Sequence, residues 1–167
     1  MATKMYIKFV GPAIVGGSKD AKHDKDVEVM SWGHGFSQPT SPVRSTAGGG
    51  TVEQANHSEF SFTKYLDSAT DDLLKQCWSG KHIDTVTFTA YRSDGVSDVA
   101  VKYLEILMTG VVVSSFSIGG GPGDIPVENV SLNYATVTYT YGSQDPAKGT
   151  GKGNQPVKHD LVLGIVS

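Results

Sequence analysis

The sequence contains almost no cysteine, no long apolar run and no strong excess of charge of one sign. Cys77 is the only cysteine among the 167 residues, so no disulfide can form within the chain. Its expected helical position beside Leu73 and Leu74 favours a small buried hydrophobic side chain over a nucleophile. Redox chemistry is therefore not expected to be the function.

Membrane-spanning and export signals are also absent. No apolar run reaches the roughly 18 residues that a membrane span needs, and the stretch MATKMYIKFV lacks the apolar core of a signal peptide. We therefore expect a chain that is made and folded in the cytoplasm, without membrane insertion. The net charge is only −3, and no window concentrates lysine and arginine. Nucleic acid is not an expected partner, because phosphate binding needs a concentrated basic face.

No motif for catalysis or cofactor binding stands out. The glycine-rich stretches lack the G-x-x-x-x-G-K-[ST] spacing, and no G-x-S-x-G is present. Asp71 and Asp72 are explained by the dipole of the expected helix. The histidines show no metal-ligand spacing, although a site assembled only in three dimensions stays open; they are His23, His34, His57, His82 and His159. We expect no enzyme activity, catalytic residues, metal or cofactor.

Strand-like segments separated by turn signals are what the sequence does have. They are MYIKFV, DVEVMSWGHGF, EFSFTKY, DTVTFTAYR, VAVKYLEILMTGVVVSSFSI, VENVSLNYATVTYTY and DLVLGIV. Alternation of apolar residues, as in Val86, Phe88 and Ala90, predicts strands that bury one face. The fifth segment is about twice an ordinary strand, so it is either two strands broken near Thr109 or one long bent strand. In the sixth, the apolar parity changes, which predicts a β-bulge near Ala135 or Thr136.

Only one segment, about residues 67–79, has a helical pattern. Leu66, Ala69, Leu73 and Cys77 share one face, Ser68 is the expected N-cap, and Gly80 is expected to end the helix. The chain is therefore predicted to be a single mainly β domain over 1–167. Its expected architecture is an antiparallel barrel or sandwich with one external α-helix.

Two loops stand apart from this pattern. Residues of about 38–55 include only Val43 and Val52 as large apolar side chains, so this extended loop has nothing of its own to bury. A second stretch, about residues 142–156, is rich in glycine and polar residues and is predicted to be a flexible loop.

Short motifs along nearly the whole chain resemble one known family. They are MYIKF (5–9), SKDAKH (18–23), SWG (31–33), FTKYLD (62–67), CWSGKH (77–82), KYLEI (102–106), VVVSSFS (111–117), ENVSLNYA (128–135) and PVKHDL (156–161). In this order they resemble the haemolysin-coregulated protein (Hcp) family, the tube proteins of bacterial type VI secretion. FTKYLD followed by CWSGKH and VSSFS is the most specific part of the match.

The resemblance implies an antiparallel two-sheet β-barrel with one external helix that assembles as a hexameric ring. Rings of this family stack into a hollow tube, which a contractile sheath expels with a valine-glycine repeat spike at its tip. Small effector proteins travel in the lumen. The implied partners are further copies of the chain, the spike protein, the sheath subunits and effectors. The implied location is the bacterial cytoplasm, followed by secretion without a cleaved signal peptide.

The resemblance also gives the extended loop a role, because in the family this loop projects along the tube axis to the adjacent ring. A loop without a core of its own is ordered by such a neighbour. The expected inter-ring residues are Pro39, Arg44, Thr46, Gly48, Gly49, Gly50, Glu53 and Gln54. The serine of the S-W-G motif faces the lumen in the family, so Ser31 is the expected cargo contact, although MSWGHGF departs from the usual surrounding sequence.

A different class of function stays open from the residues alone. Carbohydrate-binding modules hold sugars on exposed aromatic side chains of a β-sandwich, and this chain carries Trp32 and Trp78. The alternative reading is therefore a monomeric carbohydrate-binding module. We expect both tryptophans to serve instead as packing anchors.

Overall fold

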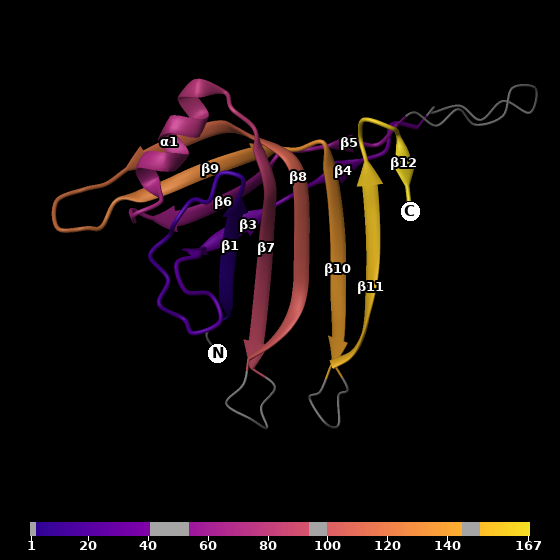
Figure 1. The fold of residues 1–167 in the computed structure, drawn as a ribbon, viewed down its shortest axis with the longest axis horizontal. Helices are drawn as coiled ribbons and strands as arrows, with labels where there is room; N and C mark the ends of the chain where they lie inside the picture. Colours follow the sequence, from indigo (N-terminus) through magenta and orange to yellow (C-terminus); the bar gives the residue numbers. More distant parts are fainter. Residues whose placement is uncertain (1–2, 41–53, 94–99, 145–150) are drawn as a thin grey trace, which may run out of the picture.

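The chain forms antiparallel β-structure with one helix packed on the outside (Figure 1). The computed structural model describes residues 3–40, 54–93, 100–144 and 151–167. Its elements are β1 (Lys4–Val10), β2 (Val27–Glu28), β3 (Ser31–Gly33), β4 (Phe36–Ser37), β5 (Asn56–His57), β6 (Phe60–Tyr65), α1 (Thr70–Ser79), β7 (Ile83–Ser93), β8 (Ala100–Gly119), β9 (Val127–Asn133), β10 (Thr136–Gln144), β11 (Gly151–Asp160) and β12 (Ile165–Val166).

The strands form two layers that share one long strand. The first layer has the order β12-β11-β10-β8-β7-β1-β2, and the second has the order β3-β6-β9-β8. β8 is one bent strand of 20 residues, as one of the two sequence-based alternatives predicted. Gly110 lies at the change of layer with φ of 60°, and a Cβ there would stand 3.0 Å from the Cβ of Ala135. Glycine is therefore required at this position.

The prediction of a closed barrel was wrong. β2 and β12 end the first layer at opposite sides, and β3 has β6 as its only partner strand among the described residues. Val29 and Met30 connect β2 to β3, and each makes one backbone hydrogen bond to a neighbouring strand. The Val29 amide donates to the carbonyl of Met5 in β1, and the Met30 amide donates to the carbonyl of Thr63 in β6. β2 is only two residues long, so it cannot continue the hydrogen-bonded ladder into the second layer. The result is two sheets joined along β8 and open elsewhere.

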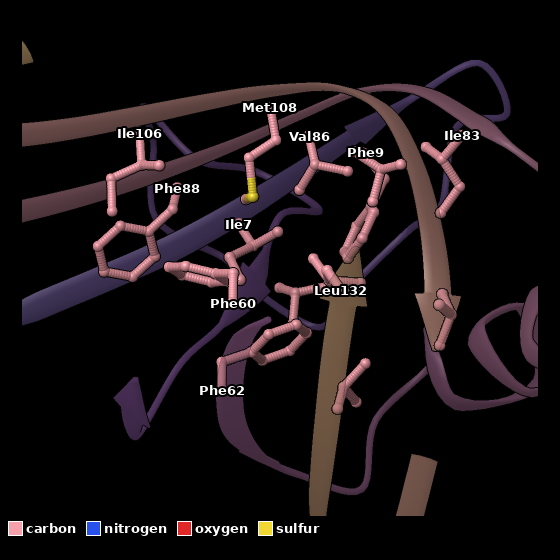
Figure 2. Packing of buried hydrophobic residues seen from close by; sticks show 14 of the residues in the cluster. Ile7, Phe9, Phe60, Phe62, Ile83, Val86, Phe88, Ile106, Met108 and Leu132 are labelled. Carbon is pink, nitrogen blue, oxygen red and sulfur yellow. The ribbon is translucent and has the colours of Figure 1, made fainter. Parts of the chain in front are cut away.

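The hydrophobic core lies between these layers (Figure 2). The ring of Phe60 in β6 packs against Phe88 of β7 at 5.5 Å and against Phe62 at 6.4 Å between ring centroids, and all three side chains are at most 2% exposed. The alternation of β6 and β7 that the sequence predicted is confirmed, because Val86 and Ala90 are fully buried as well. Each large side chain of this kind contributes about 1.5–3 kcal/mol by leaving water.

The helix α1 packs beside β8 and is shorter than predicted. It begins at Thr70, its N-cap is Ala69 without a side-chain cap, and Ser68 instead donates to the carbonyl of Val15 at 3.0 Å. Ser68 was therefore wrongly assigned as the N-cap. Gly80 ends the helix in the left-handed conformation, as predicted. Leu73 is fully buried, whereas Leu66 precedes the helix and is 45% exposed.

Two further predictions about local structure were wrong. The segment around Ala135 is the connection between β9 and β10 and not a bulge in one strand. The stretch predicted as a flexible loop at about 142–156 is mostly strand, since β10 extends to Gln144 and β11 begins at Gly151. Strand pairing across Gly142 and Asn154 supplies hydrogen bonds that the polar composition did not reveal. Within the described residues, no helix is long and apolar enough to cross a membrane.

Candidate functional site

The outer face of the second layer carries two rows of small polar side chains across its strands. Residues that alternate with the buried phenylalanines of β6 point to this face. Cross-strand pairing places Ser31, Thr63, Asn129 and Ser117 in one row, and Gly33, Ser61, Ser131 and Ser115 in the other. We call this surface the hydroxyl face. Its eight positions carry no charged and no large apolar side chain.

Hydrogen bonds organise the hydroxyl face locally. The hydroxyl of Thr63 donates to the side-chain oxygen of Asn129 at 2.8 Å. Ser61 donates to the carbonyl of Gly33 at 3.4 Å. Ser31 is exposed and helps to line a shallow depression of about 250 Å³. The structure thus places Ser31 at an open polar surface, one strand away from the Thr63 and Asn129 pair.

A short hairpin forms the stem of the extended loop. β4 and β5 pair through Phe36 with His57 and through Ser37 with Asn56. At its base, the Gly35 amide donates to the Ser58 hydroxyl at 2.7 Å, and the Ser58 amide donates to the Gly35 carbonyl at 2.8 Å. We call residues 34–37 and 54–58 the loop stem. Figure 1 shows β4 and β5 near β11 and β12.

Three histidines and two tyrosines fasten the loop stem to the sheet in one continuous series of hydrogen bonds. His34 Nδ1 lies 2.5 Å from the Tyr139 hydroxyl, and His34 Nε2 lies 2.6 Å from the Tyr134 hydroxyl. The Tyr134 hydroxyl also lies 2.7 Å from His57 Nδ1, and His57 Nε2 lies 2.7 Å from Nδ1 of His159. We call this series the histidine–tyrosine chain. It joins segments that are more than 100 residues apart in the sequence.

The surroundings of the histidine–tyrosine chain favour neutral side chains. Burial, together with the neighbouring His57, lowers the pKa of His34 from 6.5 to about 4. Burial and the neighbouring His159 likewise lower the pKa of His57. Burial raises the pKa of Tyr139 to about 12, and it raises that of Tyr134 further. At neutral pH, both tyrosines therefore keep their hydroxyl protons.

A second polar cluster lies at the opposite ends of β6 and β9, and its side chains are mostly buried. Lys64 Nζ contacts Oε2 of Glu128 at 2.5 Å and Oδ1 of Asp67 at 2.7 Å, and both Lys64 and Glu128 are 0% exposed. Thr70, the first residue of α1, donates to Oε1 of Glu128 at 2.7 Å. We call these four residues the buried ion cluster. It ties α1 to the second layer.

A third group of polar side chains lines a surface pocket of about 220 Å³ beside the amino-terminal strand β1. His23 stacks on the ring of Tyr6 and contacts Tyr91 at 2.6 Å and Asp26 at 2.7 Å. Tyr6 donates to Asp20, whose pKa is lowered to about 2 by hydrogen bonds from Lys4, the Lys22 amide and Tyr6. These side chains are hydrogen-bond partners of one another, and their contacts fix residues 18–26 against β1 and β7.

The structure describes only some of the residues expected to be functional. Pro39 lies just beyond the stem, and Gln54 is the first residue of its second half and donates to the carbonyl of Leu161 at 3.5 Å. Six expected inter-ring residues lie outside the described ranges: Arg44, Thr46, Gly48, Gly49, Gly50 and Glu53. In the part of the chain that the structure describes, no group of histidine, cysteine, aspartate and glutamate is arranged to hold a metal.

The tryptophans differ from each other. Trp32 is half-buried and stacks on Phe60 with ring centroids 5.9 Å apart, so it is a packing anchor as expected. Trp78 is 80% exposed at the end of α1, so its expected anchoring role was wrong.

Sequence reasoning missed the histidine–tyrosine chain altogether. His34, His57 and His159 have no common spacing, and only the folding of β4, β5 and β11 brings them together. The buried ion cluster did leave a signal that was not interpreted, because Lys64, Asp67 and Glu128 all lie inside the motifs FTKYLD and ENVSLNYA.

Comparisons with known proteins agree with the fold and the motifs. Residues 6–141 match the family model described as "Type VI secretion system effector, Hcp". Protein hcp1 of Pseudomonas aeruginosa is 40% identical over 161 residues, covering 95% of this chain and 94% of the relative. A solved structure titled as a type six secretion system protein aligns with a TM-score of 0.88 at 27% identity, covering 99% of this chain and all of that one. Hcp1 of Salmonella typhimurium aligns with a TM-score of 0.80 at 26% identity, over the whole of both chains.

The β-rich fold and these matches define a protein of the bacterial type VI secretion system. The chain belongs to the Hcp family, whose members are secreted structural proteins and are not known as enzymes. No finding supports the alternative of a carbohydrate-binding module.

Proposed function

We propose that this chain is the structural subunit of the inner tube of a type VI secretion system. Six copies form a ring, rings stack into a hollow tube, and the tube carries small effector proteins when a contractile sheath expels it. A valine-glycine repeat spike protein at the tip and the sheath subunits are its further partners. The protein acts from the cytoplasm and is then secreted.

The hydroxyl face is the observation that carries this proposal. A wall past which a folded effector moves must be wettable, and it must not hold the effector by strong ionic or apolar contacts. The face offers exposed serines and Asn129, with no charge at any of its eight positions, and each such polar contact is worth only about 1 kcal/mol. Ser31, at the open edge strand β3, is the proposed cargo contact.

Exposed apolar side chains at the β12 edge of the first layer are candidates for the contact between neighbouring subunits. A closed ring requires a head-to-tail interface, in which two different surfaces meet. Val162, Leu163 and Val166, which flank or belong to the edge strand β12, are 65–77% exposed. Burial of such a patch against the next subunit would remove the cost of leaving it in water.

Native mass spectrometry of the purified chain at micromolar concentration tests the ring. A species at six times 17.7 kDa, about 106 kDa, is the expected result. A clean monomer at every concentration up to about 100 μM would overturn the tube role, because a stable ring interface of at least about 1,000 Å² should hold under these conditions.

A deletion in the extended loop tests stacking separately. Removal of Ser45–Thr51, which lies outside the described residues, should leave the circular dichroism spectrum and the hexamer unchanged and should reduce the ring stacks seen by electron microscopy. A control shortens the connection between β8 and β9, residues 120–126, by a few residues while keeping a turn between the two strands. Unchanged stacking after the first deletion would show that the loop does not join the rings.

A further inference from the structure

The histidine–tyrosine chain is the strongest feature that the tube role leaves unexplained. It contains three of the five histidines of the chain, and it connects the loop stem to three separate parts of the sheet. His34 and His57 belong to the stem, Tyr139 belongs to β10, and His159 belongs to β11. Any change that breaks the histidine–tyrosine chain therefore weakens the attachment of the loop stem to the sheet.

The number of protons in this chain decides whether all four of its hydrogen bonds can form. With every imidazole neutral, one donor order satisfies each link: Tyr139 donates to His34, His34 to Tyr134, Tyr134 to His57, and His57 to His159. One extra proton on His34 or His57 is also accommodated, because the doubly protonated ring then donates in both directions.

A second proton always costs the series either one of its four hydrogen bonds or the acceptor of the Tyr134 hydroxyl hydrogen. If His57 and His159 are both cationic, two N–H groups face each other across a contact of 2.7 Å. If the two protons lie elsewhere, either the same conflict arises or the Tyr134 hydroxyl hydrogen loses its acceptor, since its oxygen must then accept from both sides. Two cationic rings also repel each other, and the ring centroids of His34 and His57 are only 6.4 Å apart.

We propose that the histidine–tyrosine chain is a pH switch that holds the loop stem against β10 and β11 near neutral pH and releases it on acidification. The switch operates within a single subunit. Its consequence for ring stacking rests on the proposed function, because the stem carries the loop that would join adjacent rings.

No described carboxylate is placed to neutralise these cations. The neighbouring segments present Phe36 and Phe60 to His34. Asp160, next to His159, accepts from the amides of Val162 and Leu163. The remaining nearby titratable side chains are exposed; they are Glu59, His82 and Lys158. His82 lines a surface depression together with Tyr134 of the histidine–tyrosine chain.

The sign of the effect follows from the direction of the pKa shifts. The pKa of His34 is lowered from 6.5 to about 4, so the attached stem disfavours the proton relative to the released stem. Attachment is therefore strongest above about pH 6.5 and weakens as the pH falls from about 6.5 toward about 4. The lowered pKa of His57 acts in the same direction.

Hydrogen exchange of the full-length protein at pH 7.5 and pH 5.0 tests the switch, after correction for the intrinsic pH dependence of exchange. The Gly35 and Ser58 amides bond within the stem, and a hairpin of two residue pairs is not stable once it leaves the sheet. We therefore expect the protection of these amides to fall at least about tenfold at pH 5.0, while protection in β7 stays constant. His57→Gln keeps a donor and an acceptor without titrating, so the fall in stem protection should be smaller than in the parent, and the part that remains is due to His34. His82→Gln removes an exposed histidine that is not part of the histidine–tyrosine chain, so its stem protection should depend on pH as in the parent protein.

The outcomes are decisive for the switch itself. Tyr134→Phe keeps the ring but removes the bridging hydroxyl, so its stem should already exchange quickly at pH 7.5. Constant stem protection across the pH range in the parent protein, or an undiminished pH response in both His57→Gln and Tyr134→Phe, would overturn the proposal. Because the stem lies within one chain, the exchange result can be read even if native mass spectrometry shows a monomer and the tube role fails.

Discussion

β6 and β9 carry a polar cluster at each end, and the two clusters are built in opposite ways. At the Lys64 end, the buried ion cluster joins a lysine to two carboxylates. At the Phe60 end, the histidine–tyrosine chain begins from His57 and Tyr134, which flank the two strands and are linked at 2.7 Å. The first cluster depends on charge and the second on the absence of charge. One pair of strands can thus hold a permanent anchor and a pH-responsive one.

The largest effect is expected from removing the cation of the buried ion cluster. Lys64→Met leaves the carboxylate of Glu128, which is 0% exposed, with the Thr70 hydroxyl as its one remaining partner among the contacts described above. Loss of one partner of a buried pair costs about 3–5 kcal/mol, and thermal or urea unfolding measures it. The double variant Lys64→Met with Glu128→Leu is the control and should recover most of the loss. Equal losses in both variants would mean that packing at this site matters more than charge.

A smaller effect is expected from the outer end of the neutral chain. Tyr139→Phe deprives His34 Nδ1 of its hydrogen bond at 2.5 Å while keeping the ring that stacks on His34 at 5.8 Å. We expect a loss of about 1 kcal/mol at pH 7.5 and a smaller difference from the parent at pH 4, where the parent's chain is already broken. A loss that stays the same at both pH values would show that Tyr139 acts through packing alone.

The smallest effect is expected from a pair at the surface. Lys102 Nζ lies 2.5 Å from Oε2 of Glu105, and the two side chains are 45% and 30% exposed. Lys102→Ala should change the free energy of unfolding by less than about 1 kcal/mol, because solvent and salt screen such pairs. Lys102→Arg, which keeps the charge, is the matched variant. A change above about 2 kcal/mol would place this pair in the same class as the buried ion cluster, contrary to the ranking by burial.

The sequence predicted those features that depend on local patterns. Alternation identified β6 and β7, helical spacing and Gly80 identified α1, and ordered motifs identified the family. Closure of the barrel could not be read in this way, because it depends on whether the two-residue strand β2 reaches β3. Composition also misled the prediction at 142–156, where backbone pairing between β10 and β11 outweighs a polar sequence.

The candidate site was predicted least completely. Ser31 does lie at an exposed polar face, but its neighbours in the two rows, apart from Gly33 of its own strand, come from residues 30 to 100 positions further along the chain. His34 and His57 meet Tyr134 and His159 only after β9, β10 and β11 have formed. Such long-range juxtapositions leave no periodic trace, so a single sequence cannot reveal them.

The continuity of β8 through both layers has a consequence for how the molecule unfolds. One strand of 20 residues pairs with β7 and β10 in its first half and with β9 in its second. Neither layer can separate from the core without exposing part of the strand that completes the other. The domain should therefore melt as one cooperative unit, with a single calorimetric peak whose enthalpy equals the van't Hoff value. In the tube proposed above, a subunit under load should therefore unfold as a whole or not at all.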